Sequence, residues 1–467
     1  MKFKIQLIVD DEGGQTQIED ILQLDKDSEY GHTAGLSLQE SKQLLKRLQK
    51  NIVLYQAKSY THSHRKCTSC HRNRRIKDER SIQYRTLFGT VVIPNLRLYH
   101  CPCEHASART FSILDPWLPE NCSPELQYIE TKWASHMSFS KTSTLLQDVL
   151  PVSLTHNKVT VRNHLHKVAK RQEAELEKKP FCISGCANDW AKLPKPGKPL
   201  VVGIDGGYVR SCKDRKSNFE VIVGKSLSKN KPAKRFGLVQ CMDKRPQRRL
   251  LHVLREQGMQ ENQQITFLSD GADNVRELQY LMHPESEHIL DWFHLTMRLT
   301  VLNQCAKGLS HSDAEEGKEF STKLESAKWY LWHGNVEKAQ DCLEDCYCIA
   351  VNEDIDYKGQ KNLIKYLEEL ETYIDNNRHL IPNYGERWRY GEAISSSFVE
   401  STVNEVVTKR MVKKQQMQWS EQGAHYLLQT RTATLNGDLG HYFERWYPGV
   451  NITNEEDERL PDWKKAA

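Results

Sequence analysis

The pattern of apolar and polar positions divides the first 180 residues into three regions. An apolar run near the amino terminus predicts a strand, and apolar positions at helical spacing predict an amphipathic helix over about 37–55. Two strand-like runs follow over 81–100, and helical periodicity continues through 124–179. We therefore expect a strand and a helix, then a β-rich module, then a helical region.

The pattern changes after residue 198. Prolines and glycines over 180–198 predict a linker. Three apolar runs then predict a meander of strands, and helices alternate with strands as far as residue 293. This order is βββαβαβ, which predicts a mixed sheet of an α/β fold. Residues 294–390 are helical and interrupt the α/β core, which resumes at 391.

A chain of 467 residues is expected to form several domains. The predicted division is 1–56 for the N-terminal strand and helix, 57–110 for the β-rich module, 111–179 for the helical region, 180–198 for the linker, 199–293 and 391–445 for the α/β core, 294–390 for the helical insertion, and 446–467 for the tail.

Composition and charge limit the cellular locations and the kinds of partner that we expect for the protein. No apolar run approaches the roughly 18 residues of a membrane span, so we expect no membrane partner, and the amino terminus lacks the features of a signal peptide. Thirteen cysteines without an export signal favour reduced or metal-bound thiols in the cytoplasm. The net charge of +5 is uneven: residues 57–110 carry 11 Lys/Arg against 3 Asp/Glu, and 209–250 carry 13 against 3. Such basic segments favour a nucleic-acid partner.

Four cysteines flank the hairpin-like stretch of the β-rich module. Cys67-x2-Cys70 and Cys101-x-Cys103 have the layout of a zinc ribbon, in which four thiolates hold a structural Zn²⁺ ion. The second pair is tighter than the usual Cys-x2-Cys, so His100 or His105 remains an alternative ligand, and a metal-free thiol cluster remains an alternative to the site.

Basic residues of both N-terminal modules are candidates for contact with double-stranded DNA. In the zinc-ribbon-like module, Arg72, Arg74 and Arg75 would contact phosphates without reading sequence. The helical region ends in a basic helix that resembles the second helix of a helix-turn-helix, with five basic and no acidic residues over 155–172. Its candidate contacts to the major groove are Lys158, Arg162, Asn163 and Lys170. The alternative is a solvated basic face.

Three acids of the α/β core are candidate ligands of catalytic metal ions. Asp205 lies inside an apolar strand, where an unpaired carboxylate would cost several kcal/mol. Asp270 ends another apolar strand, and Glu400 lies on a late helix. Phosphoryl transfer to or from DNA uses two divalent ions about 3.5–4 Å apart, and carboxylates suit Mg²⁺ or Mn²⁺. Each acid alone is more often a turn or capping residue, so their combination carries the prediction.

At these residues the sequence resembles bacterial insertion-sequence transposases of the Asp-Asp-Glu class, related to the Mutator-like transposases. The matching motifs are Asp205-Gly206, Ser269-Asp270-Gly271 and Asp291-x2-His294, and the acids are separated by 65 and 130 residues. The resemblance implies an RNase H-like core and implies that His294 approaches DNA near the site. It also implies cleavage of transposon ends and strand transfer into target DNA. Synapsis of two ends implies at least a homodimer, located at the nucleoid.

Several alternatives stay open. Asp291 is the rival for a catalytic aspartate, and Glu392 and Glu405 are rivals for the glutamate. Glu400 is preferred because Asn404 follows it by one helical turn, and Lys409 and Arg410 follow by two to three. One helix face would then offer a metal ligand, an amide and two cations that bind DNA phosphates. The alternative functions are a non-catalytic DNA-binding regulator and a structure-specific DNA nuclease.

Overall fold

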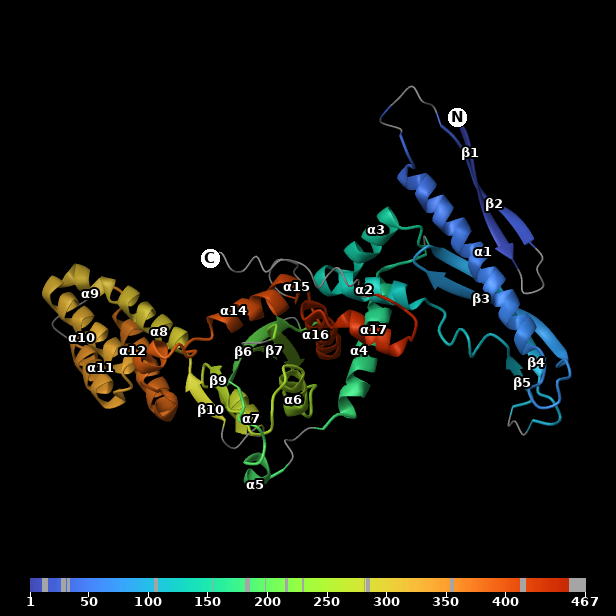
Figure 1. Ribbon diagram of the computed structural model, residues 1–467. Helices are drawn as coiled ribbons and strands as arrows, with labels where there is room; N and C mark the ends of the chain where they lie inside the picture. Colours follow the sequence, from blue (N-terminus) through green and yellow to red (C-terminus); the bar gives the residue numbers. More distant parts are fainter. Residues whose placement is uncertain are drawn as a thin grey trace. The chain divides into compact units, whose positions relative to one another are not determined.

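The computed structural model is a mixed α/β protein (Figure 1). It describes residues 1–10, 16–26, 31, 34–104, 108–153, 155–180, 185–197, 199–214, 217–228, 231–280, 282, 286–352, 357–411 and 417–452. The chain forms two compact units. Unit 1 comprises Met1–Ala169 and Gly437–Ala467, and unit 2 comprises Lys170–Asn436. The division falls inside a helix rather than in the predicted linker, and residues from Gly437 onward group with unit 1 rather than with the core.

Unit 1 begins with a two-stranded hairpin followed by a long helix. Strands β1 (Lys2–Asp10) and β2 (Thr16–Asp25) pair antiparallel. Helix α1 (Leu38–His64) starts at a capping box, in which the hydroxyl of Ser37 accepts from the amide of Glu40 while the Glu40 carboxylate accepts from the amide of Ser37. The sequence predicted β1 and α1 but not β2, and α1 extends about nine residues beyond its predicted end.

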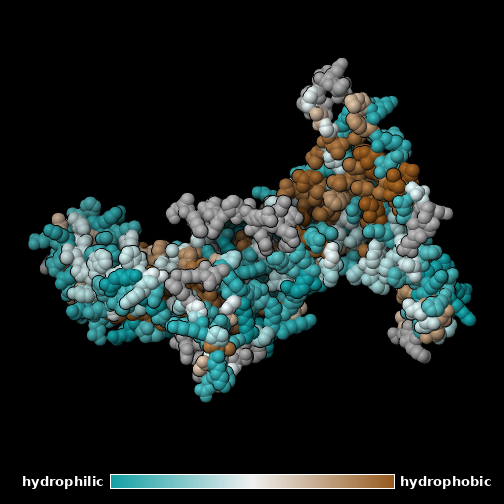
Figure 2. All heavy atoms as spheres, viewed as in Figure 1, coloured by the Kyte–Doolittle hydropathy of each residue, from teal (hydrophilic) through white to brown (hydrophobic). Residues whose placement is uncertain are grey.

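An apolar surface area covers the start of α1 and the neighbouring strand β1 (Figure 2). Phe3 and Ile8 of β1 are 46% and 61% exposed, and Leu38 of α1 is 58% exposed. The hairpin has only two strands, and α1 packs mainly on β2, so these side chains remain at the surface.

A second sheet of unit 1 has the order β3-β4-β5, with all neighbours antiparallel. Its strands are β3 (Ile76–Thr86), β4 (Gly89–Tyr99) and β5 (Thr110–Ser112). The second half of α1 covers β4, and Val53, Val91, Ile93 and Leu98 form the core between them. The two predicted strand-like runs therefore form a hairpin.

The helical region of unit 1 consists of α2 (Pro124–His136), α3 (Phe139–Val149) and α4 (Lys158–Glu177), as the periodicity predicted. Ser123 and Ser138 accept hydrogen bonds at the amino termini of α2 and α3. Helix α17 (Leu439–Trp446) also packs on α2.

Unit 2 is built on a five-stranded sheet of order β10-β9-β6-β7-β8. Its elements are β6 (Leu200–Arg210), β7 (Asn218–Leu227), β8 (Lys234–Val239), α6 (Pro246–Glu256), β9 (Ile265–Ser269), α7 (Asp273–Tyr280) and β10 (Glu287–Leu290), and the short helix α5 (Ala187–Trp190) precedes them. β6 pairs antiparallel with β7 and parallel with β9. The βββαβαβ order expected from the sequence is confirmed.

Helices complete unit 2. Their bounds are α8 (Trp292–Cys305), α9 (Lys307–Ser312), α10 (Ala314–Trp332), α11 (Val336–Ala350), α12 (Gln360–Asn377), α13 (Tyr384–Arg389), α14 (Ser397–Val403), α15 (Lys409–Met411) and α16 (Glu421–Leu435). The described part of residues 294–390 contains helices and a 3-10 turn but no strand, which agrees with the predicted insertion. Helix α14 packs on β6 and β7, and α16 packs on β8.

Candidate functional site

Asp205 lies where helix α14 crosses strand β6. Side chains alternate along a strand, so Gly203, Asp205 and Gly207 share one face of β6. A Cβ atom on Gly203 would lie 2.0 Å from Cγ2 of Val399, and one on Gly207 would lie 3.5 Å from Cγ1 of Val403. The two glycines therefore let α14 rest directly on the strand, on the face that carries Asp205.

Asp270 follows the carboxyl end of the neighbouring strand. β6 and β9 are parallel, and their register pairs Gly203 with Leu268. Two residues farther along each strand, the same register brings Asp270 beside Asp205, on the same face of the sheet. The Asp270 carboxylate accepts from the amide of Ala272 at 3.1 Å, which fixes the turn after the strand. The two aspartates are therefore adjacent.

Glu400 lies on α14, near enough to act electrostatically on Asp205. Burial raises the pKa of Asp205 above its ordinary value, and the charges of Asp270 and Glu400 add to the rise, while His294 and the amide of Gly206 oppose it. Glu400 itself is exposed. The charges of both other predicted acids, Asp270 and Glu400, thus reach Asp205 at this end of the sheet.

The rivals of Glu400 are engaged elsewhere. Glu392 pairs with Arg387 at 3.1 Å, and Arg387 also pairs with Glu287 at the start of β10, the opposite end of that strand from the acids. Glu405 pairs with Arg235 of β8 at 2.9 Å. Neither rival contributes to the electrostatics of Asp205 as Glu400 does.

Asp291 is a buried capping residue at the amino terminus of α8. Its carboxylate accepts from the amides of Phe293 and Ser396, each at 2.9 Å, from the Ser396 hydroxyl, and from Nδ1 of His294 at 2.7 Å. Four donors occupy its oxygens, so Asp291 is a positioning residue rather than an open metal ligand. It joins the start of α8 to Ser396, which directly precedes α14, the helix of Glu400.

The hydrogen bond from Asp291 also sets the charge of His294. It raises the pKa of His294 above 6.5, burial opposes this, and the charges of Asp205 and Asp270 raise the pKa further. Because Nδ1 is bonded to Asp291, the Nε2 atom is the ring nitrogen available to other partners. The raised pKa thus favours the protonated form of His294 beside the two aspartates.

Replacing Asp291 with asparagine is expected to lower the pKa of His294 and to destabilise unit 2. An amide cannot stabilise imidazolium as a carboxylate does, so the pKa should fall, as measured from the ring nitrogen chemical shifts of His294 in NMR. The lost charge-assisted hydrogen bonds should cost about 1.5–3 kcal/mol in urea unfolding at pH 7. An unchanged His294 pKa would contradict the assigned contact.

The stability difference should depend on pH in a defined direction. Burial raises the pKa of Asp291, but the hydrogen bonds from His294 and Ser396 outweigh it, and the net pKa lies below 3.8. A lowered pKa contributes stability above the ordinary value, and this is lost as pH falls through the folded-state value. The wild type should therefore approach D291N in stability below pH 3.8. Ser396→Ala, which keeps the histidine contact, is the matched control.

The candidate DNA-binding residues after Glu400 lie partly at the surface and partly in the interior. Asn404 opens a π-helical turn, Asn404–Thr408, and is exposed, as is Lys409. Arg410 is fully buried, and its guanidinium lies 5.2 Å from the Trp419 ring. The prediction that Arg410 contacts DNA phosphates is therefore wrong. The π-turn holds an extra residue, which rotates the following positions relative to an ordinary α-helix.

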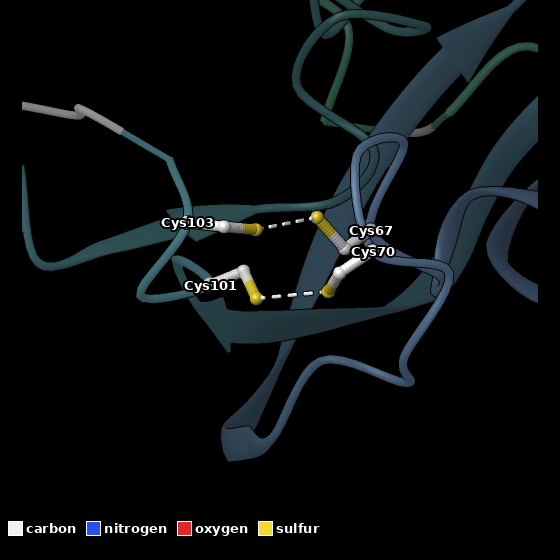
Figure 3. Close-up of side chains that lie close together, drawn as sticks. All are labelled: Cys67, Cys70, Cys101 and Cys103. Carbon is white, nitrogen blue, oxygen red and sulfur yellow. Dashed lines mark hydrogen bonds between the residues drawn. The ribbon is translucent and has the colours of Figure 1, made fainter.

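The four cysteines of unit 1 form a compact group (Figure 3). The Sγ atoms of Cys67 and Cys103 lie 3.4 Å apart, as do those of Cys70 and Cys101. These separations exceed a disulfide bond of about 2.05 Å and approach the edge of about 3.8 Å that a tetrahedron with 2.3 Å zinc–sulfur bonds would have. All four ligand atoms lie within 4.8 Å of one another, so the cluster can hold a metal ion.

Glu104 braces this cysteine cluster. It accepts from Nη2 of Arg74 at 2.5 Å, from the amide of Cys101 at 3.1 Å and from Nδ1 of His100 at 3.1 Å. Arg74 holds the pKa of Glu104 at about 2. The guanidinium of Arg74 also donates to the carbonyls of His64 and Lys66. Arg74 is therefore a structural residue, and the prediction that it contacts a DNA phosphate is wrong. His100 is bonded to Glu104, and His105 lies outside the described residues.

The other candidate DNA contacts in unit 1 are at the surface. Arg72 and Arg75 are exposed, and on α4 the side chains of Lys158, Arg162 and Asn163 are exposed. Lys170, on the part of α4 that belongs to unit 2, is also exposed.

A buried glutamate fixes α4 against α2. The carboxylate of Glu130 on α2 contacts Nε2 of His156, just before α4, at 2.7 Å, and also contacts Nδ1 of His164 on α4. The exposed face of α4 is therefore held in place by buried contacts on its opposite side.

Comparison with known proteins does not assign the chain to a family. No protein-family model matches the sequence, and no curated protein matches it. None of the described helices is long and apolar enough to cross a membrane. The function must therefore be argued from the site.

Proposed function

We propose that the protein is a DNA transposase of the Asp-Asp-Glu class with an RNase H-like core. The observation that carries this proposal is the gathering of Asp205, Asp270 and Glu400 at one end of the five-stranded sheet. Burial and the charges of Asp270 and Glu400 raise the pKa of Asp205. A buried carboxylate placed beside other carboxylates is unfavourable for stability, and such an arrangement is typical of a site that binds cations.

The topology supports the same proposal. The resemblance implies a first acid on the first strand, a second acid after the fourth strand and a third on a late helix. Asp205 is on β6, the first of the five strands, Asp270 follows β9, the fourth, and Glu400 is on α14 beyond the insertion. β6 is the central strand of the sheet, it pairs with β9, and α14 packs on it.

The three acids fit a pair of Mg²⁺ or Mn²⁺ ions. Carboxylates are the ligands that such ions prefer, and two-ion sites of this kind hold the ions about 3.5–4 Å apart. The ions would activate water or a 3'-hydroxyl and stabilise the leaving oxygen. Asp205, Asp270 and Glu400 would hold them, and Asp291 would orient His294 beside them.

The remaining parts of the proposal concern DNA binding and assembly. We propose that the cysteine cluster holds Zn²⁺ and that Arg72, Arg75 and the basic face of α4 bind the terminal repeats of a transposon. Synapsis of two ends requires at least a dimer, and the exposed apolar side chains of β1 and α1 are a suitable surface for a second copy. The expected location is the cytoplasm, at the nucleoid.

Cleavage of DNA that flanks the protein's own gene tests the proposal. The full chain is incubated with labelled fragments from both flanks and an unrelated target plasmid, in Mg²⁺, Mn²⁺, Ca²⁺ or EDTA. Metal-dependent nicking at the repeat ends, followed by joining to the plasmid, is the expected result. Cleavage without end specificity or joining would indicate the nuclease instead. Specific binding without cleavage in any metal would indicate the regulator.

A further inference from the structure

A groove of about 630 Å³ lies in unit 2 between α8 and α12. Arg298 of α8 lines it and is four residues after His294, so both side chains lie on the same face of that helix. The guanidinium carbon of Arg298 is 4.1 Å from the ring centroid of Tyr373 on α12. Arg298 also forms a side-chain hydrogen bond with Tyr373. Because a guanidinium has five N–H donors, the others at its edge remain able to donate.

Tyr373 is in turn tied to the loop of the second acid. Its hydroxyl donates to the backbone carbonyl of Asp270 at 2.8 Å, and its own carbonyl accepts from Nδ2 of Asn377 at 2.9 Å. Gly271 packs on the same residue: its φ is +86°, and a Cβ there would lie 2.3 Å from Oδ1 of Asn377. Arg298 therefore has a fixed position relative to Asp270.

The charge of the groove differs between its two ends. Lys365 pairs with Glu369 at 3.7 Å, and Glu368 contacts the Tyr347 hydroxyl at 3.3 Å. These side chains lie one to two turns of α12 before Tyr373, that is, farther from Asp270. Among the described residues no carboxylate forms an ion pair with Arg298. Its guanidinium lies at the end of the groove where Tyr373 contacts the loop of Asp270.

We propose that Arg298 binds one phosphate of the DNA strand that enters the site of Asp205, Asp270 and Glu400, an inference that rests on the proposed function. A planar guanidinium with its edge exposed matches the paired oxygens of a phosphodiester. The acids Glu368 and Glu369 would repel a strand that continued along the groove. The contact is therefore expected to involve a single phosphate.

The salt dependence of DNA binding tests this assignment. The full chain is titrated against a labelled 40-base-pair duplex from the DNA flanking its gene, with Ca²⁺ in place of Mg²⁺, over a range of salt concentrations. In Arg298→Ala, loss of one phosphate contact should make the slope of log K against log salt less steep by about 0.9. The affinity of the variant relative to the wild type should therefore be about eightfold lower at 0.1 M salt than at 1 M salt. Arg298→Lys should keep the wild-type slope.

Lys365→Ala is the matched control, since it removes a paired cation from the same groove and should leave the slope unchanged. Thermal unfolding of each variant verifies that it is folded. An Arg298→Ala slope equal to that of the wild type, or an equal change in Lys365→Ala, would overturn the assignment while metal-dependent cleavage still supported the proposed function. Failure of the wild type to bind the duplex would overturn both.

Discussion

Alanine in place of Asp205, Asp270 or Glu400 should abolish metal-dependent cleavage of the flanking DNA while leaving DNA binding intact. The expected loss is on the order of 10³-fold or more, equivalent to at least about 4 kcal/mol of barrier, because each acid would hold a metal ion that stabilises the charge developing in the transition state. Single-turnover cleavage of labelled DNA gives the rate, and a gel-shift titration in Ca²⁺ gives the affinity.

Glu392→Gln and Glu405→Gln are the matched controls for the third acid. Both remove a carboxylate from unit 2 that is already paired with an arginine. They should cleave at rates close to the wild type. Retained cleavage in Glu400→Ala, with loss in either control, would reassign the third ligand.

Asp205→Asn should also make the protein more stable in the absence of metal. The pKa of Asp205 is raised in the folded state, so ionisation of this group opposes folding at neutral pH. A neutral amide of the same shape removes that opposition, and the melting temperature measured in EDTA should rise. An inactive variant that is more stable than the wild type separates a functional acid from a structural one.

Loss of the metal from the cysteine cluster should strongly reduce the stability of the β-rich module around it. The wild type is expected to contain one zinc ion per chain by elemental analysis, and Cys67→Ser should contain none. Structural zinc sites contribute on the order of 10 kcal/mol or more in zinc-finger peptides. Treatment with a strong chelator should therefore unfold the end of the β3–β4 hairpin next to the cluster. Hydrogen exchange would detect this as faster exchange of the backbone amides in that region.

Cys241→Ser provides the control, because Cys241 is an exposed thiol of unit 2 outside the cluster. It should retain full zinc content and normal exchange. The helix-packed part of the sheet, around Ile93 and Leu98, has its own apolar core and should stay protected after chelation. Zinc-free wild-type protein with unchanged exchange at the cluster would contradict a structural metal.

The strands that carry the two aspartates could be predicted from the sequence alone. The runs before Asp205 and Asp270 are apolar because both faces of these strands are covered, so a polar residue within them is conspicuous. Strand β2 was missed because most of its side chains are exposed, and its two fully buried residues, Ile21 and Leu22, are adjacent rather than alternating. A strand of which α1 covers only a short part gives little periodic signal.

The errors among the basic residues have a different physical origin. Arg74 was taken for a surface cation because its partner, Glu104, is 30 residues away in the sequence and meets it only when the cysteines come together. Arg410 was placed on the face of Glu400 on the assumption of an uninterrupted α-helix, and the π-turn between them changes the phase. The roles of Ser396 and Tyr373 also depend on long-range contacts that local patterns do not encode.

The position of α14 in the chain has a consequence for how the protein is made. Val399 packs over Gly203, yet about 200 residues, including the whole insertion, separate the two in the sequence. Domains tend to fold in order as they leave the ribosome, so the sheet with both aspartates can form before Glu400 has been synthesised. A chain that stops early would then carry two of the three acids and be inert. Under the proposed function, DNA cleavage would then have to wait for residues that are synthesised about 200 positions after Gly203.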